Sequence, residues 1–130
     1  MSSIFTRIVQ REIPAYIIAE DAKNMAILDI NPLVEGHVLV FPKMEVDWIF
    51  DLPDADYKAL MEFSKDIANA LSRVYPSKRV TMSVLGLEVP HAHIHLIPIN
   101  QVSELNFSKV RVPLSSEDFQ VCLDRLKSEF

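Results

Sequence analysis

Three histidines lie at alternate positions in the stretch HAHIHLIPI, which begins at residue 91. Because residues two apart in a β-strand point to the same face, a strand places His91, His93 and His95 on one face and the apolar residues between them on the other. A helix would spread the three imidazoles around its axis. We therefore expect a strand over 91–97 with an apolar face on the core and an imidazole face. Pro98 should end this strand or confine it to a sheet edge.

A row of imidazoles is costly to bury unless each ring has a hydrogen-bond partner or a ligand. The residue types permit two kinds of chemistry. Histidines on one strand face can converge on zinc, and His37, the fourth histidine of the chain, could supply a further ligand. Alternatively, a neutral imidazole can attack phosphorus while a charged neighbour stabilises the negative oxygen atoms. The spacing alone leaves both possibilities open.

The composition restricts the class of protein. A length of 130 residues suits one domain with one core, and 49% hydrophobic with 24% charged residues is typical of globular proteins. The net charge of −5 argues against nucleic-acid or membrane partners, although it permits a small anionic ligand. The single cysteine, Cys122, cannot form an internal disulfide, and the N-terminal residues lack a long apolar run. We therefore expect a cytoplasmic protein.

The pattern of apolar residues predicts an α+β fold in one domain covering residues 1–130. Five segments have the composition of strands: 15–20, 24–30, 37–42, 79–86 and 91–97. A helical pattern runs over about 54–75 and should cover one face of an antiparallel sheet. Ser115 or Ser116 should cap a short C-terminal helix. Its expected buried stripe is Phe119, Cys122, Leu123, Leu126 and Phe130.

The stretch HAHIHLIP resembles the signature of the histidine triad superfamily, which comprises nucleotide hydrolases and transferases. Residues 4–21, IFTRIVQREIPAYIIAED, are similar to the N-terminal block of its nucleoside phosphoramidase-like branch. Residues 28–43, LDINPLVEGHVLVFPK, resemble a second block, in which an aspartate precedes a histidine by eight residues, as Asp29 precedes His37. The resemblance covers about residues 4–99 and implies a five-stranded antiparallel sheet with one long helix. Residues 100–130 are an extension outside it.

The resemblance implies a covalent mechanism. His93 is the expected nucleophile on the α-phosphorus of a purine nucleotide, with a nucleotidyl-histidine intermediate that water hydrolyses. His95 is expected to contact the phosphate oxygens, and His91 and His37 to hold the imidazole cluster. A nucleoside phosphoramidate is the expected substrate, without metal or cofactor, and the chain is expected to form a homodimer through the long helix and a strand edge. The alternatives are a dinucleoside polyphosphate hydrolase, a nucleotide-binding protein with little turnover, and a zinc-binding module.

The resemblance also implies binding residues. Asp29 should accept hydrogen bonds from the ribose hydroxyls, because a carboxylate offers acceptors to two adjacent donors. Four apolar positions match those that line the base pocket: Phe5, Ile8, Ile13 and Ile30.

The sequence departs from the pattern of the superfamily in three places. Leu87 and Glu88 replace a glutamine and a hydroxyl residue before the triad. The Asn-x-Gly that usually precedes them is also absent, and Ser83 is the expected substitute for its asparagine in nucleotide binding. Glu88 is expected to meet a cationic or amino leaving group. Glu45 replaces a histidine that commonly follows the Pro-Lys pair. In the C-terminal extension, Lys109 and Arg111 could meet phosphates but are expected to be solvated surface charges.

Overall fold

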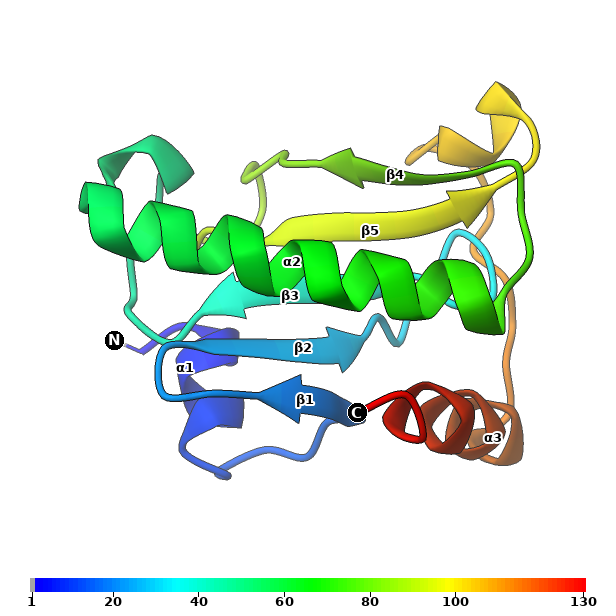
Figure 1. Ribbon diagram of the computed structural model, residues 1–130, viewed down its shortest axis with the longest axis horizontal. Coiled ribbons are helices and arrows are strands. Elements are labelled where there is room, and N and C mark those ends of the chain that lie inside the picture. Colours follow the sequence, from blue (N-terminus) through cyan, green and yellow to red (C-terminus); the bar gives the residue numbers. More distant parts are fainter. Residues whose placement is uncertain (1) are drawn as a thin grey trace.

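A five-stranded antiparallel sheet with the strand order β1-β2-β3-β5-β4 forms the centre of the structure, a computed structural model that describes residues 2–130 (Figure 1). The strands are β1 Ile17–Glu20, β2 Asn24–Leu28, β3 Val38–Pro42, β4 Arg79–Ser83 and β5 Ile94–Ile99. Every residue of β2, β3 and β5 is buried, whereas β4 is a partly exposed edge. The central strands are therefore covered on both faces.

One face of the sheet is covered by helix α2, Asp54–Val74, as Figure 1 shows. Its stripe of apolar residues, including Leu60, Ile67 and Leu71, packs against the side chains of Ala92, Ile94 and Leu96 and their neighbours on the sheet. The predicted helix over 54–75 is confirmed to within one residue. This packing fixes the apolar face of the histidine segment, as its alternation predicted.

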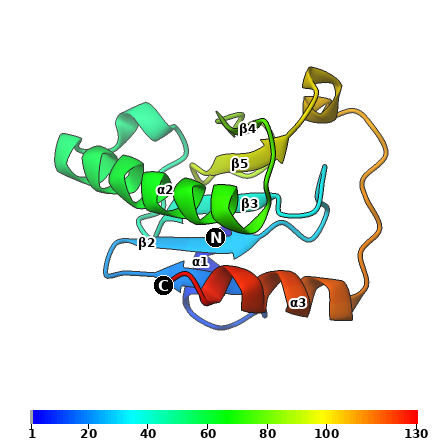
Figure 2. The same cartoon turned by 45° about the vertical axis from the view of Figure 1, so that its right-hand side comes forward.

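Helix α3, Ser116–Lys127, lies beside α2 and packs against β1 (Figure 2). Ser115 caps it by accepting a hydrogen bond from the backbone N–H of Asp118, and the Asp118 carboxylate accepts one from the N–H of Ser115. The predicted buried stripe is confirmed for Phe119, Cys122, Leu123 and Leu126. It is wrong for Phe130, which is exposed because the helix ends three residues earlier.

The opposite face of the sheet carries the short helix α1, Ile4–Val9, and a second apolar cluster. Its buried members are Phe5, Ile8, Met25, Ile27, Leu39 and Phe41. Residues of β2 and β3 alternate between this cluster and the α2 side, as the two-residue period of a strand requires. His95 lies opposite Leu39 in the pairing of β5 with β3, so the histidines share the α1 face.

The histidine strand differs from its predicted bounds. β5 begins at Ile94 and continues through Pro98 to Ile99, so His91 and His93 precede it. The expectation that Pro98 ends the strand or confines it to an edge is wrong for the strand as a whole. Pairing with β3 reaches only from Ile94 to Leu96, and Pro98 pairs with β4 alone, so its missing N–H costs little there.

Short 3-10 helices occur at Ile49–Asp51 and Val102–Leu105. Over the part of the chain that the structure describes, no helix combines the length and the apolar character needed to cross a bilayer.

Candidate active site

His93 lies just before β5, with its side chain on the α1 face. Its Nδ1 atom is 2.8 Å from the backbone oxygen of His91, so in the neutral ring Nδ1–H donates and Nε2 keeps its lone pair. The ring of Phe5 lies 4.9 Å from the His93 ring and supports it. A free imidazole lone pair of fixed orientation is what nucleophilic attack by histidine requires.

His91 is fully buried and ties the histidine segment to α1. Its Nε2–H donates to the backbone oxygen of Pro42 at 2.7 Å, so its Nδ1 atom accepts the hydroxyl hydrogen of Ser3, also at 2.7 Å. Ser3 is the N-cap of α1, and its backbone N–H donates to the Glu45 carboxylate. Burial lowers the pKa of His91, which keeps this ring neutral.

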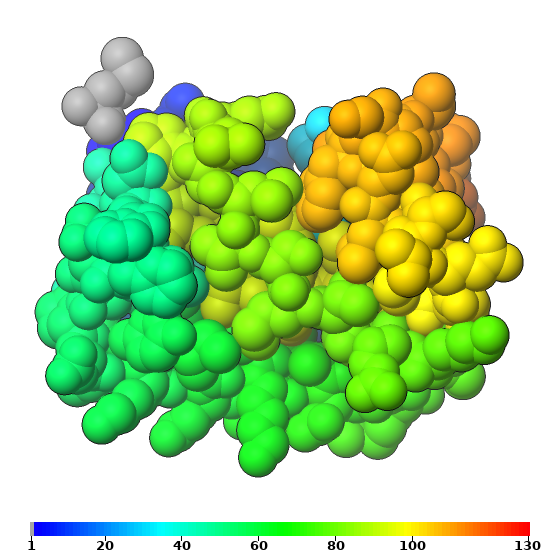
Figure 3. Space-filling view, turned by 90° about the horizontal axis from the view of Figure 1, so that it is seen from above, coloured from blue at the N-terminus to red at the C-terminus, as the bar shows by residue number. Residues whose placement is uncertain are grey.

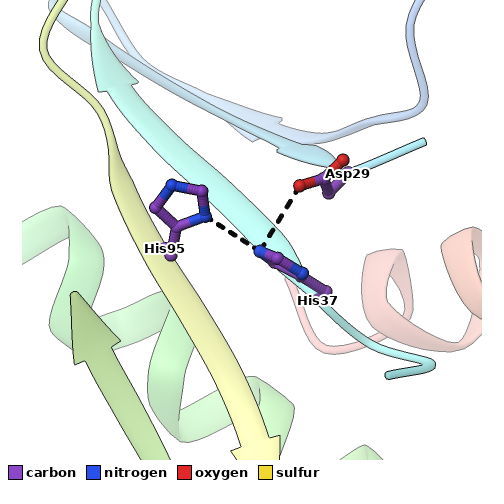
Figure 4. Close-up of side chains that lie close together, drawn as sticks. All are labelled: Asp29, His37 and His95. Carbon is purple, nitrogen blue, oxygen red and sulfur yellow. Dashed lines mark hydrogen bonds and ion pairs between the residues drawn. The ribbon is translucent and has the colours of Figure 1, made fainter. Parts of the chain in front are cut away.

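His37 and His95 form a second pair (Figure 4). The backbone N–H of Leu33 donates to Nδ1 of His37 at 3.0 Å, which places the ring proton on Nε2. That Nε2–H points to Nδ1 of His95 at 2.9 Å, and therefore the proton of His95 is on its own Nε2. Burial lowers the pKa of His37 to about 3 and that of His95 to about 4, in agreement with two neutral rings.

Exposure separates the four histidines into two classes. His37 and His91 are 1% and 0% exposed, whereas His93 and His95 keep 7% and 8%. In His93 and His95, one ring nitrogen each lacks a hydrogen-bond partner within residues 2–130. These are Nε2 of His93, which has a free lone pair, and Nε2 of His95, which has a free N–H. An imidazole lone pair and an N–H donor thus face the same side of the sheet.

Asp29 lies at the end of this row, where β2 runs into a loop. Its Oδ1 accepts a hydrogen bond from the N–H of Asn31 at 2.8 Å, and its Oδ2 is 3.4 Å from Nε2 of His37. Burial raises the pKa of Asp29, and the Asn31 hydrogen bond and the charge of Arg111 oppose that rise. The carboxylate is therefore held in a fixed orientation beside the histidines.

The ligand atoms of Asp29, His37 and His95 lie within 4.8 Å of one another, which is close enough for a shared metal ion. The hydrogen bonds oppose such an ion. Nε2 of His37 carries the ring proton, and moving this proton to Nδ1 would set it against the N–H of Leu33. A metal ligand must offer a lone pair, so this donor set does not fit a metal ion.

The HIT domain family model matches residues 10–102 of this chain. The chain belongs to the HIT domain family. Adenosine 5′-monophosphoramidase hnt1 of Schizosaccharomyces pombe is 30% identical over 131 residues, covering 99% of this chain and 98% of that protein.

Two solved structures show the same fold. A HIT-like protein of Bartonella henselae involved in cell-cycle regulation has a TM-score of 0.85 at 22% identity, covering 99% of this chain and 96% of that one. A zinc-bound histidine triad family protein of Mycobacterium smegmatis has a TM-score of 0.80 at 27% identity, covering 98% and 95%. The predicted α+β fold and the predicted superfamily are confirmed.

The other predicted site residues of this HIT protein fall into three environments. Phe5 and Ile8 are buried, and Ile13 is partly buried in the α1 cluster next to the histidines. Ile30 is 65% exposed and lies outside that cluster. Ser83 of β4 pairs with His95, so its side chain shares the histidine face. Their assignment to nucleotide binding stays a prediction.

The loop between β4 and the histidine segment carries the replaced residues Leu87 and Glu88. Leu87 is 90% exposed, and Glu88 is exposed as well. No hydrogen bond or ion pair joins Glu88 to another side chain within residues 2–130, so its carboxylate is free to meet a ligand. Its expected contact with a leaving group stays a prediction.

Sequence reasoning did not place three contacts of the site. Glu45 accepts the hydroxyl hydrogen of Thr6 at 2.7 Å in addition to the Ser3 N–H, and so holds α1 against the histidine segment. The Phe107 ring lies 5.1 Å from that of His95. The prediction that Arg111 is a solvated surface charge is wrong: it is half-buried and donates to two backbone oxygens.

Proposed function

We propose that this HIT protein hydrolyses purine nucleotides at the α-phosphate, with a nucleoside 5′-phosphoramidate as substrate. The hydrogen-bond pattern supports this proposal, because it leaves the Nε2 lone pair of His93 free next to the Nε2–H of His95. The relative in S. pombe named adenosine 5′-monophosphoramidase, which this chain matches along nearly its whole length, supports the phosphoramidate over other substrates.

The proposed reaction has two displacements. Nε2 of His93 forms a bond to the α-phosphorus as the bond from phosphorus to the leaving amine breaks. The amine leaves with the electron pair of that bond and takes up a proton from solvent water. The N–H of His95 donates to a phosphate oxygen and stabilises the added charge. Water then attacks the phosphorus and gives up a proton to solvent, the bond from phosphorus to Nε2 of His93 breaks with its electron pair returning to Nε2, and the nucleoside monophosphate is released. The Asp29 carboxylate accepts hydrogen bonds from the ribose hydroxyls.

The test is AMP release from adenosine 5′-phosphoramidate and from diadenosine tetraphosphate, separated by anion-exchange chromatography. Wild type should release AMP faster from the phosphoramidate, and His93→Ala should lower the rate by more than about a thousandfold. A rapid quench should trap wild type carrying one adenylate group at His93. Faster release from the tetraphosphate would favour a dinucleoside polyphosphate hydrolase. Tight AMP binding without release from either substrate would indicate a binding protein.

Glu88→Gln, with Glu62→Gln on the exposed side of α2 as the charge control, tests the leaving-group contact. We expect Glu88→Gln to reduce the preference for amine over phosphate leaving groups and Glu62→Gln to leave it unchanged. Unchanged selectivity in both variants would remove Glu88 from the proposed site.

Zinc binding is a second candidate, because the M. smegmatis relative is zinc-bound. The ring proton on Nε2 of His37 argues against it at the Asp29, His37 and His95 group. Equilibrium dialysis against zinc decides this point: retention of one equivalent per chain, lost in His95→Ala, would favour the zinc site. We expect no retention at that group.

We also propose a homodimer in which the β4 edge meets a second copy. β4 is an edge strand, and apolar side chains are exposed on it and just beyond it, namely Met82 at 45%, Val84 at 41% and Leu85 at 46%. Sedimentation equilibrium should give twice the chain mass, and Val84→Arg should shift it toward the monomer. A monomeric wild type at micromolar concentration would contradict this arrangement.

A further inference from the structure

The segment Leu105–Val112 lies beyond the residues matched by the HIT domain family model and crosses the loop that follows Asp29. Nη1 of Arg111 donates to the backbone oxygen of Asn31 at 3.0 Å, and the N–H of Val112 donates to the backbone oxygen of Pro32 at the same distance. Two bonds therefore fix this part of the C-terminal extension to the loop that carries Asp29.

Phe107 anchors the same segment against the histidines. Its ring meets that of His95 edge-on at 5.1 Å and that of His37 edge-on at 6.3 Å. The guanidinium of Arg111 lies over the Phe107 ring at 5.7 Å and also donates to the Phe107 backbone oxygen. Beneath them, Leu105 and Phe107 pack on an apolar cluster of Leu33, Ile97 and Ile99. The segment is thus a packed wall of the site.

The space-filling view shows a hollow between this wall and the end of β4 (Figure 3). The orange segment near residue 110 forms one side of the hollow, and the yellow-green residues near 85 form the other. A ligand that reaches the histidine face through this hollow passes the C-terminal extension. The extension is therefore placed to influence which ligands bind.

Arg111 also acts on Asp29 through Asn31. The backbone N–H of Asn31 donates to Oδ1 of Asp29, and its backbone oxygen accepts a hydrogen bond from Arg111. Both backbone polar groups of Asn31 are therefore fixed, one by Asp29 and one by Arg111. The groups that face the Asp29 carboxylate are His37, His95 and His93, together with the positive charge of Arg111. Since His37 and His95 are neutral, Arg111 supplies positive charge that balances this nearly buried carboxylate.

We propose that the segment Leu105–Val112 forms the ribose side of the site, and that Arg111 is a positioning residue that orients Asp29 to select ribonucleotides over 2′-deoxyribonucleotides. The selection follows from the acceptor geometry, since a fixed carboxylate can accept from two adjacent hydroxyls but gains less from one. This inference rests on the proposed function for its kinetic test, and a binding measurement keeps it testable without turnover.

The experiment compares wild type, Arg111→Gln, Arg111→Lys and Lys109→Gln with adenosine 5′-phosphoramidate and its 2′-deoxy analogue. Arg111→Gln should raise the KM for the ribonucleotide about tenfold, the usual size for one charge-assisted hydrogen-bond contact, and leave that for the deoxy analogue within about twofold. The kcat values should change little, because the triad is intact. Arg111→Lys should recover part of the discrimination through its charge.

Lys109→Gln removes the same charge from the same segment and should keep wild-type discrimination. If wild type releases no product, calorimetric titration with AMP and 2′-deoxy-AMP compares the Kd values for the two sugars instead. This binding measurement separates failure of this inference from failure of the proposed function. Thermal unfolding of each variant identifies any that fails to fold. Two results would overturn the proposal. One is that Arg111→Gln weakens the binding of the ribonucleotide and of its 2′-deoxy analogue equally. The other is that Lys109→Gln reduces the discrimination between them as much as Arg111→Gln does.

Discussion

The change Ser3→Ala tests whether α1 and the first histidine of the triad are coupled through one hydroxyl group. The Ser3 hydroxyl accepts from the N–H of Thr6 as the N-cap of α1, and it donates to Nδ1 of His91 at 2.7 Å. Both groups of this second bond are buried, with Ser3 7% exposed and His91 fully enclosed. Alanine removes both bonds at once.

The expected loss in the free energy of unfolding has two parts. Loss of an N-cap costs about 1 kcal/mol. Loss of the close donor to a buried acceptor, here Nδ1 of His91, costs about 1–3 kcal/mol. The Thr6 hydroxyl is a poor replacement, because it lies 3.5 Å from Nδ1 and already donates to Glu45. Ser3→Ala should therefore cost roughly 2–4 kcal/mol in total.

Ser115→Ala is the matched control, because Ser115 caps α3 in the same way but is exposed, and within residues 2–130 it has no hydrogen bond to a histidine. It should lose only the cap, about 1 kcal/mol. Ser2→Ala, an exposed change next to Ser3, should be close to wild type. Urea unfolding at pH 7 and one protein concentration gives all three values.

If Ser3→Ala is no more destabilised than Ser115→Ala, the hydroxyl bond to His91 contributes nothing and the coupling is refuted. A second readout is the nitrogen chemical shift of Nδ1 of His91, which should move in Ser3→Ala and stay in Ser115→Ala.

Two further predictions concern pH and backbone geometry. The free energy of unfolding should fall as the pH drops below about 6.5, because burial holds the pKa of His37 near 3 and that of His95 near 4 while the unfolded chain takes up protons at these rings. The loss between pH 7 and pH 5 should be roughly 2 kcal/mol per ring, and His37→Gln should show a smaller loss in urea unfolding. At Gly36, where φ is +92°, an added Cβ would lie 3.1 Å from Tyr75, so Gly36→Ala should cost about 2–4 kcal/mol. Gly86→Ala, with φ at +70° in open space, should cost about 1 kcal/mol, and equal costs would show that the contact with Tyr75 is unimportant.

The alternation of histidines was sufficient to predict that the imidazoles share one face of the segment and the apolar residues the other. This property depends only on the two-residue period of an extended chain. The start of β5 was not predictable in the same way. It begins at Ile94 because pairing with β3 starts there, opposite Val40, and that register is set by another strand. His91 and His93 therefore precede the strand, although their side chains keep the expected face.

The contacts that the sequence did not predict are long-range contacts. They involve residues whose types are already accounted for by a local role, such as a helix cap or a surface charge. Ser3 and Glu45 are 42 residues apart, and each alone indicates a cap or a surface charge. Arg111 lies in an irregular segment where no period predicts burial, so solvent exposure was the natural expectation. Its partners are backbone oxygens of Asn31 and Phe107, which any residue could supply and which leave no trace in the sequence.

The burial of four imidazoles has a consistent explanation in their proton positions. The backbone N–H of Leu33 sets the tautomer of His37, and His37 in turn sets that of His95. The backbone oxygen of Pro42 sets the tautomer of His91, whose own backbone oxygen orients His93. Each ring thus has one N–H proton placed by the main chain or by a ring that the main chain has oriented. Such a row needs no metal ion to hold it. Within residues 2–130 it leaves two nitrogen atoms unpaired, Nε2 of His93 with a lone pair and Nε2 of His95 with a proton, and these suit the nucleophile and the donor of the proposed phosphoryl chemistry.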